Sequence, residues 1–80
     1  MIDALRQRFG LSPCEAALLE RFINRGGLHH RDVNEFGNLF RVRRNHIHKK
    51  LGRVVIMNEW GEGYLMNEVN RDWLKREALG

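Results

Sequence analysis

Apolar residues recur every three to four positions in several parts of the chain, and this spacing predicts amphipathic helices. The longer segments with helical spacing are residues 3–9, 13–25, 39–51 and 67–79. A shorter helix is predicted around Val33 and Phe36, and the Gly37-Asn38 pair ends it. Each segment has an apolar stripe, so we expect the helices to pack against one another around a shared core.

The start of the second segment has the most specific local signal in the sequence. Ser12 can cap the helix, Pro13 suits the first helical position, where no amide donor is needed, and Glu15 can close a capping box. The Gly26-Gly27 pair ends the segment. These signals fix both boundaries of a helix that is expected to bury one face.

The chain after residue 53 changes to a strand pattern. Residues 54–57 are apolar and mostly β-branched, residues 59–63 contain two glycines, and residues 64–66 are again largely apolar. This pattern predicts a β-hairpin with a glycine-rich tip. The order of helix, helix, basic helix and hairpin predicts a mainly α fold with a small β-hairpin, the winged helix-turn-helix.

The 80-residue chain is long enough for one small domain only. A winged-helix core is expected over residues 11–66, with an added N-terminal helix at residues 3–9 and an added C-terminal helix at residues 67–79. The hydrophobic content of 42% and the charged content of 30% are typical of a globular protein. A chain of this size buries only about 60% of its unfolded surface, so a partner subunit could add to its core.

The formal net charge is +4 and the sequence pI is about 10.0, which favours a polyanionic partner. The basic residues are concentrated between Arg41 and Arg53. A single cysteine, Cys14, rules out an intrachain disulfide, is expected to be a small packing residue, and fits a reducing cytoplasm. No apolar run is long enough for a signal peptide or a membrane span, so neither is expected.

Residues 39–51 are the most informative segment, because their polar positions are almost all basic and none is acidic. On a helical wheel, Phe40, Ile47 and Leu51 fall on one side. The opposite side carries Arg41, Val42, Asn45, His46 and Lys49. The flanks carry Arg43, Arg44, His48 and Lys50. This distribution is typical of a helix that packs on a core and presents its other face to DNA.

A helix in the DNA major groove distinguishes base pairs through a few side chains of different character. Asn45 can make two hydrogen bonds to adenine, and Arg41 or Arg43 can do so to guanine. Val42 can pack against a thymine methyl, and His46 can donate or accept a hydrogen bond. Cations toward the end of the helix suit phosphates, which give affinity without sequence information. They are Lys49, Lys50 and Arg53.

Three short motifs also resemble a known family. They are Leu11-Ser12-Pro13-x-Glu15-x-x-Leu18-Leu19, Phe40-x-Val42 through Ile47-x-Lys49-Lys50-Leu51, and Gly61-x-Gly63-Tyr64. Their order and spacing over residues 11–66 resemble the C-terminal DNA-binding domain of OmpR/PhoB-type response regulators. The resemblance implies a winged-helix fold. It also implies DNA contacts at Val42, Arg43, Asn45, His46 and His48.

The sequence departs from that family at two places that bear on binding. The family has an apolar residue at the position of Arg44, so either the helix is rotated slightly or Arg44 extends past the core to a phosphate. Trp60, between Glu59 and Glu62, stands where the family presents a basic residue to the minor groove. Trp60 could stack on DNA, contact a protein or fold onto the core, whereas Asn58 remains a phosphate donor.

The third departure is the link between the short helix around Val33 and Phe36 and the basic helix. In the response regulators the corresponding loop is longer and contacts RNA polymerase, whereas only Gly37-Asn38 is expected here. No receiver domain precedes the helices in the 80 residues, so control by phosphorylation is not expected. Repression or architectural binding is therefore favoured over activation.

Other kinds of chemistry have less support in the sequence. The candidate zinc ligands lack a metal-site spacing; they are Cys14, His29, His30, His46 and His48. No nucleophile has a convincing base and no glycine-rich loop precedes a helix as nucleotide binding requires, so no catalytic residue, metal or cofactor is predicted. RNA binding ranks third, because the basic face lacks stacking aromatic residues.

The sequence therefore predicts a sequence-specific double-stranded DNA-binding transcriptional regulator, in the cytoplasm of a bacterium or of a phage-infected host. The alternative is a winged-helix module that binds a transcription component or another protein through the wing and the C-terminal helix, with Trp60 and Trp73 as anchors. The C-terminal segment has an apolar stripe that would either pack on the body or form a homodimer, first through Trp73 and Leu74. The stripe consists of Val69, Trp73, Leu74 and Leu79.

Overall fold

The computed structural model describes residues 2–33, 39–59, 61 and 63–79, and the side chains of residues 58 and 59 lie outside that description. Its elements are α1 (Ile2–Phe9), α2 (Pro13–Arg25), β1 (Gly27–His29), α3 (His30–Val33), α4 (Leu39–Leu51), β2 (Met57–Glu59), β3 (Gly63–Leu65) and α5 (Glu68–Leu79). Helices dominate, and β2 and β3 form the small hairpin. This confirms the predicted mainly α fold with a small β-hairpin.

The boundaries of α2 are those that the capping signals predict. The Ser12 hydroxyl accepts a hydrogen bond from the Glu15 amide, and a Glu15 carboxylate oxygen accepts one from the Ser12 amide. At the other end Gly26 adopts a φ of 78°, and its amide donates to the Phe22 carbonyl. Each such cap contributes about 1 kcal/mol to the helix that it closes.

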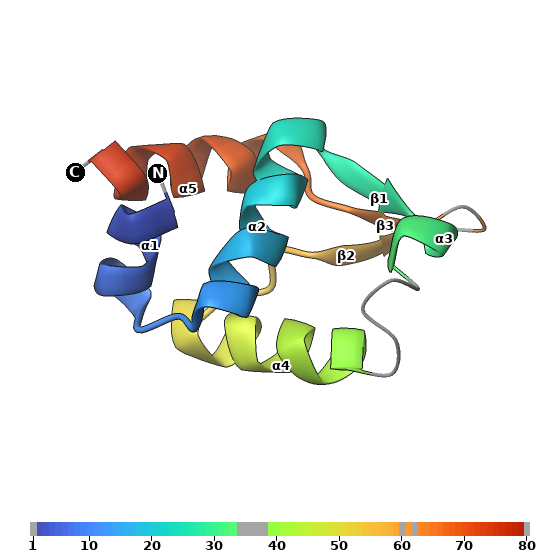
Figure 1. The fold of residues 1–80 in the computed structure, drawn as a ribbon. Coiled ribbons are helices and arrows are strands. Elements are labelled where there is room, and N and C mark those ends of the chain that lie inside the picture. Colours follow the sequence, from blue (N-terminus) through green and yellow to red (C-terminus); the bar gives the residue numbers. More distant parts are fainter. Residues whose placement is uncertain (1, 34–38, 60, 62, 80) are drawn as a thin grey trace.

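The core is built around α2, which lies at the centre of the molecule (Figure 1). The helix buries five apolar side chains completely, namely Ala16, Leu18, Leu19, Phe22 and Ile23. The helices α1, α4 and α5 and the loop before β2 each add apolar side chains to this cluster, including Leu5, Phe40, Ile47, Leu74 and Val55. The α4 helix therefore rests on the core along its apolar side, as predicted from the wheel.

The sheet has three antiparallel strands in the order β1-β3-β2. The strand β1 was not predicted, because its three residues contain one apolar side chain and no alternation. It follows α2 directly, and Leu28 pairs with Tyr64. A side chain on Gly63 would collide with the Leu28 carbonyl oxygen, so the absence of a side chain lets β1 and β3 pair this closely.

The first strand of the hairpin begins later than predicted. Residues 54–56 form no strand, and β2 begins at Met57. The reason lies in the hydrogen bonds of this segment: the Ile56 amide donates to the His48 imidazole, and the Val54 carbonyl accepts from the Asn70 side chain. Val55 and Ile56 are buried as expected of apolar residues, but the hydrogen bonds of this segment go to α4 and α5 rather than to a strand.

The helix α5 packs back on the body beside α1 (Figure 1). Its Trp73 ring lies 5.7 Å from the Phe9 ring, and Leu74 is fully buried. Glu77 accepts a hydrogen bond from the Arg8 guanidinium at 3.0 Å. Of the two uses predicted as alternatives for this segment, the structure shows packing on the body, and Leu74 is buried there rather than available for a dimer contact.

Two further expectations need correction. The predicted apolar stripe of α5 included Val69 and Leu79, whose exposed fractions are 66% and 90%. The face that packs instead carries Asn70, Trp73, Leu74 and Ala78, because it follows the spacing of i, i+3, i+4 and i+8 from Asn70. Cys14 is exposed rather than packed, since Glu15 and Ala16 are the residues of this turn that face inward.

Candidate nucleic-acid interface

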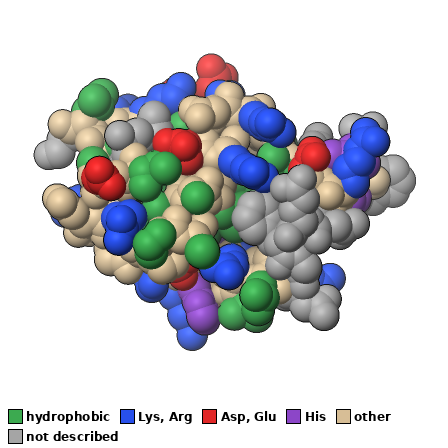
Figure 2. Space-filling view, in the orientation of Figure 1, with side chains coloured by type: hydrophobic (Ala, Val, Ile, Leu, Met, Phe, Trp, Pro, Cys, Tyr) green, Lys and Arg blue, Asp and Glu red, His purple; other side chains and the backbone are tan. Residues whose placement is uncertain are grey.

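The outer face of α4 is mostly polar and basic. The five residues that the helical wheel placed opposite the core, Arg41, Val42, Asn45, His46 and Lys49, are all exposed, so the structure confirms this face assignment. Leu39 and Lys50 of the same helix are exposed as well. Figure 2 shows Lys, Arg and His side chains, together with apolar ones, along the edge of the molecule where α4 lies.

The exposed face has the size and chemistry that a major groove requires. A helix of 13 residues supports it, in which Arg41, Asn45 and Lys49 lie one turn apart in one row. Val42 and His46 form a second row beside it. An amide, an imidazole, an aliphatic side chain and two cations can each interact with a different feature of a base pair or a phosphate. The helix contains no acidic residue that would repel the DNA backbone.

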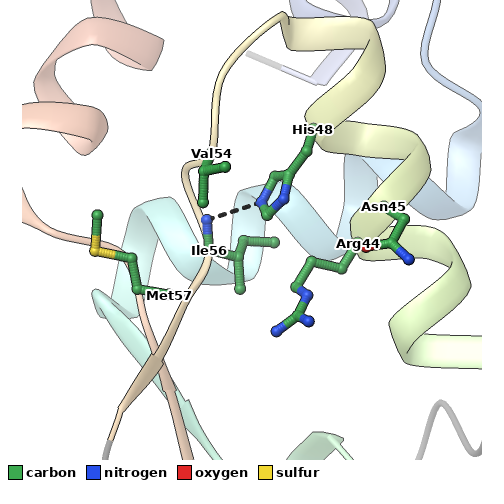
Figure 3. Close-up of a pocket in the computed structure, with 6 residues that line it drawn as sticks. All are labelled: Arg44, Asn45, His48, Val54, Ile56 and Met57. Atoms are coloured by element: carbon green, nitrogen blue, oxygen red, sulfur yellow. Dashed lines mark hydrogen bonds between the residues drawn. The ribbon is translucent and has the colours of Figure 1, made fainter.

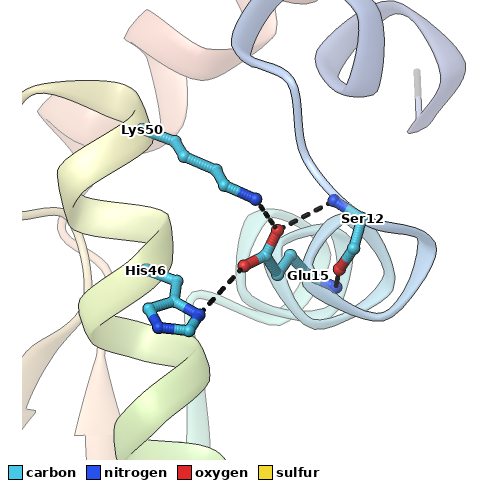
Figure 4. A network of polar contacts seen from close by, with 4 residues as sticks. All are labelled: Ser12, Glu15, His46 and Lys50. Carbon is cyan, nitrogen blue, oxygen red and sulfur yellow. Dashed lines mark hydrogen bonds and ion pairs between the residues drawn. The ribbon is translucent and has the colours of Figure 1, made fainter.

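His46 and Lys50 share a carboxylate from another helix (Figure 4). The Lys50 ammonium donates to Glu15 Oε1 at 2.7 Å, and His46 Nδ1 lies 3.8 Å from Glu15 Oε2. Glu15 was predicted only to close the capping box, because no local pattern indicates a partner 35 residues away. Lys50, predicted to contact phosphate, is instead paired within the protein.

Glu15 is almost fully buried, with an exposed fraction of 4%. Burial by itself raises the pKa of the Glu15 carboxyl, but the hydrogen bonds from Lys50 and from the Ser12 amide outweigh it, and the net effect is a lowered pKa. The carboxylate is therefore charged at neutral pH. Its charge stabilises the contact between α2 and α4 at pH values above its ordinary pKa, and this contribution is lost as the pH falls through the lowered pKa.

His48 does not belong to the exposed face, although the family resemblance implied that it contacts DNA. Its Nε2 accepts a hydrogen bond from the Ile56 amide at 3.1 Å, so the ring turns toward the loop before β2 (Figure 3). Burial lowers the pKa of His48, and the nearby Arg44 guanidinium lowers it further. At neutral pH the imidazole is an uncharged acceptor with a structural role.

Arg44 extends past the core, which was one of the two alternatives for this residue. Its side chain is half-buried and its guanidinium carbon lies 5.2 Å from the centre of the Tyr64 ring. It lines an open groove between α4 and the segment before the hairpin, together with Asn45, His48, Val54, Ile56 and Met57 (Figure 3). Its Nε is buried and has no hydrogen-bond partner among the described residues.

The remaining residues that were predicted to contact DNA differ in exposure and in their neighbours. Arg43 is half-buried on the flank of α4, and Arg53 is exposed with its guanidinium carbon 4.4 Å from the centre of the Trp73 ring. Asn58 belongs to β2, where it pairs with Tyr64, but its side chain is outside the described part. Trp60 and the Gly37-Asn38 link are also outside the described residues.

Neither a metal centre nor a membrane segment is visible in the described part of the chain. Within residues 2–33, 39–59, 61 and 63–79, no three or more His, Cys, Asp or Glu side chains are grouped so that they could hold a metal ion. Over the same residues, no helix combines the length and the apolar character needed to cross a bilayer.

Comparison of the chain with protein-family models, with curated proteins and with solved structures gave no match. The properties of α4 and its surroundings are therefore the basis for any functional assignment.

Proposed function

We propose that the chain is a sequence-specific double-stranded DNA-binding protein that places α4 in the major groove and regulates transcription. The observation that supports this most directly is the exposed face of α4. It carries Arg41, Val42, Asn45, His46 and Lys49, while the opposite side of the same helix is anchored in the core. A solvated basic helix would not need an amide, an imidazole and an exposed valine among its cations.

The proposed roles follow from side-chain chemistry. Asn45 and His46, at the middle of the face, contact base edges, and Val42 packs against a thymine methyl. Arg41 contacts guanine or phosphate, while Lys49 and Arg53, near the end of the helix, contact phosphates. Because α4 projects few base-reading residues, a homodimer on a symmetric site would double the number of bases read.

The mode of regulation that we favour is repression or architectural binding in the cytoplasm of a bacterium or of a phage-infected host. The support for this mode is the short sequence between α3 and α4, residues 34–38, which leaves little chain for a loop that contacts RNA polymerase. It also follows from the proposed occupancy of DNA, which by itself can exclude other proteins.

A test separates base recognition from phosphate binding. Fluorescence anisotropy with random duplex DNA over a salt series measures the phosphate contribution, and selection from a random pool gives the preferred duplex. We expect Asn45→Ala and His46→Ala each to reduce the preference for the selected duplex by about 1–3 kcal/mol. Lys49→Ala should weaken binding to all duplexes and lower the salt slope by about 0.9.

Lys75→Ala serves as the matched control, because Lys75 is an exposed lysine on α5 rather than on α4. It should change the salt slope less than Lys49→Ala does. Equal losses on every duplex from Asn45→Ala and Lys49→Ala would contradict base recognition by α4.

A second candidate function is supported by the open face of the sheet. Met57 pairs with Leu65, and their exposed fractions are 39% and 36%, so apolar surface remains uncovered on the hairpin. A protein partner seated there would make the chain an interaction module. Binding to DNA at low salt that is weakened by Lys49→Ala and by Arg41→Ala would favour the first candidate, and no binding to any duplex would favour the second.

A further inference from the structure

Glu15 is placed between the core and the basic helix in a way that helix capping does not require. The capping box uses one carboxylate oxygen, which accepts the Ser12 amide at 2.8 Å, and glutamine would serve equally well for that contact. The negative charge of a glutamate at this position adds contacts with α4. The same carboxylate accepts the Lys50 ammonium and faces His46, which lie one turn apart on α4.

The geometry gives Lys50 a setting different from that of Lys49. Lys49 is exposed and no contact between it and an acidic side chain is found among the described residues. Lys50 has a side chain that is 38% exposed and a carboxylate partner at 2.7 Å that is itself 5% exposed. A cation paired with a buried carboxylate is already neutralised, so it releases no counterion when it approaches a phosphate.

The carboxylate also restricts His46. The imidazole is 57% exposed, with Nδ1 directed toward Glu15 and the rest of the ring accessible on the outer face of α4. The carboxylate of Glu15 is held in place by the Ser12 amide and by burial against the core around α2. A fixed carboxylate 3.8 Å from Nδ1 narrows the orientations that the ring samples before it meets a base.

We infer that Glu15 is a positioning residue that raises the sequence specificity of α4, because it withholds the charge of Lys50 from phosphates and orients His46 for base contact. This inference rests on the proposed DNA-binding function. Phosphate contacts strengthen binding to every sequence equally, whereas base contacts strengthen binding to one. Removing one cation from the phosphate-binding set while retaining the base-contacting residues therefore increases the ratio of specific to non-specific affinity.

The test compares salt slopes on random duplex DNA for Lys49→Met, Lys50→Met, Glu15→Gln and the double variant Glu15→Gln/Lys50→Met. Lys49→Met should lower the slope by about 0.9, and Lys50→Met should leave it close to the wild-type value. Glu15→Gln should raise it by about 0.9, because Lys50 becomes free to contact a phosphate. The double variant should return to the wild-type slope.

Specificity provides a second measurement on the same proteins. Glu15→Gln should lower the ratio of affinity for the selected duplex to affinity for random duplex. The double variant should regain the part of this loss that the freed Lys50 causes, but not the part that follows from the looser orientation of His46. A purely structural role for Glu15 would weaken both affinities together and would not steepen the salt dependence.

Two controls separate these effects from changes in net charge and in folding. Glu20→Gln changes the net charge by the same amount on the same helix and should leave the slope nearer to wild type than Glu15→Gln does. Ser12→Ala removes the hydroxyl cap and leaves the carboxylate of Glu15 in place, so it reports on loss of stability alone. Circular dichroism at the binding temperature checks that each variant is folded.

A Lys50→Met slope that falls as far as that of Lys49→Met would overturn the inference, and so would a Glu15→Gln slope equal to that of Glu20→Gln. In both cases the wild-type chain still binds DNA and the proposed function stands. Absence of salt-dependent binding by the wild-type chain to any duplex would instead overturn the proposed function, and the inference with it.

Discussion

The residues of α4 form two groups, one that faces the body of the protein and one that faces solvent. The helical wheel predicted this division correctly for Arg41, Asn45 and Lys49, because the spacing of apolar residues alone fixes which side packs. It could not predict the settings of His48 and Lys50. Their partners, the Ile56 amide and the Glu15 carboxylate, come from other elements and have no local signature.

The half-buried His48 should make folding stability depend on pH. In the unfolded chain its pKa is about 6.5, and burial lowers the pKa in the folded chain. Between the two values the unfolded state binds more protons, so the free energy of unfolding should decrease as the pH falls through this window. Protonation also removes the acceptor that the Ile56 amide uses.

Urea unfolding at pH 7.5 and at pH 5.0 checks this expectation. The loss of stability between the two pH values should be smaller in His48→Gln than in the wild type. His29→Gln, which removes an exposed imidazole, should keep the wild-type difference. An identical loss in His48→Gln and wild type would show that His48 does not cause the pH dependence.

Among the elements, the four longer helices and β3 were predicted within one or two residues, whereas β1 was missed and β2 begins three residues later than predicted. Helix boundaries carry chemical signals, such as the Ser12 cap and the Gly26 terminus, that act over one turn. The strands have three residues each, which is too short for an alternating pattern. Their pairing depends on contacts between β1 and β3 that lie far apart in sequence.

Gly63 offers a test of this pairing. An added methyl group would lie 2.0 Å from the Leu28 carbonyl oxygen, so Gly63→Ala should force β1 away from β3. We expect a loss of more than about 2 kcal/mol in the free energy of unfolding, which is large for a point substitution. Chemical denaturation measures the loss.

Gly10→Ala is the comparison, because no atom lies within 4 Å of the added group and only the φ of 68° is unfavourable. It should cost about 1–2 kcal/mol. A smaller loss for Gly63→Ala than for Gly10→Ala would contradict the close approach of β1 and β3.

On the scale of the whole molecule, α1 and α5 close the helical end of the core, opposite the sheet (Figure 1). Their contacts combine the Phe9 and Trp73 rings, the Arg8 and Glu77 ion pair and the buried Leu74. Periodicity predicted a helix here but not its partner, because Trp73 and Leu74 suit an internal core and a subunit interface equally well. The orientation of α5 is set instead by contacts such as the Arg71 hydrogen bond to the Ile23 carbonyl.

Substitution of Leu74 distinguishes these two uses. Leu74→Ala should lower the free energy of unfolding by about 2–5 kcal/mol, because it leaves a cavity in the core. The loss should be the same at low and high protein concentration, as thermal unfolding over a range of concentrations would show. Val69→Ala, at a position that is 66% exposed, should change stability by no more than about 0.5 kcal/mol.

The ion pair between Arg8 and Glu77 joins residues that are 69 positions apart. During synthesis on a ribosome, α1 therefore emerges long before the helix that covers it. Until α5 has left the exit tunnel, Phe9 lacks the Trp73 ring against which it packs in the finished protein. The nascent chain consequently carries uncovered apolar surface at Phe9 until α5 has left the tunnel, so compaction of this end of the core waits for that helix.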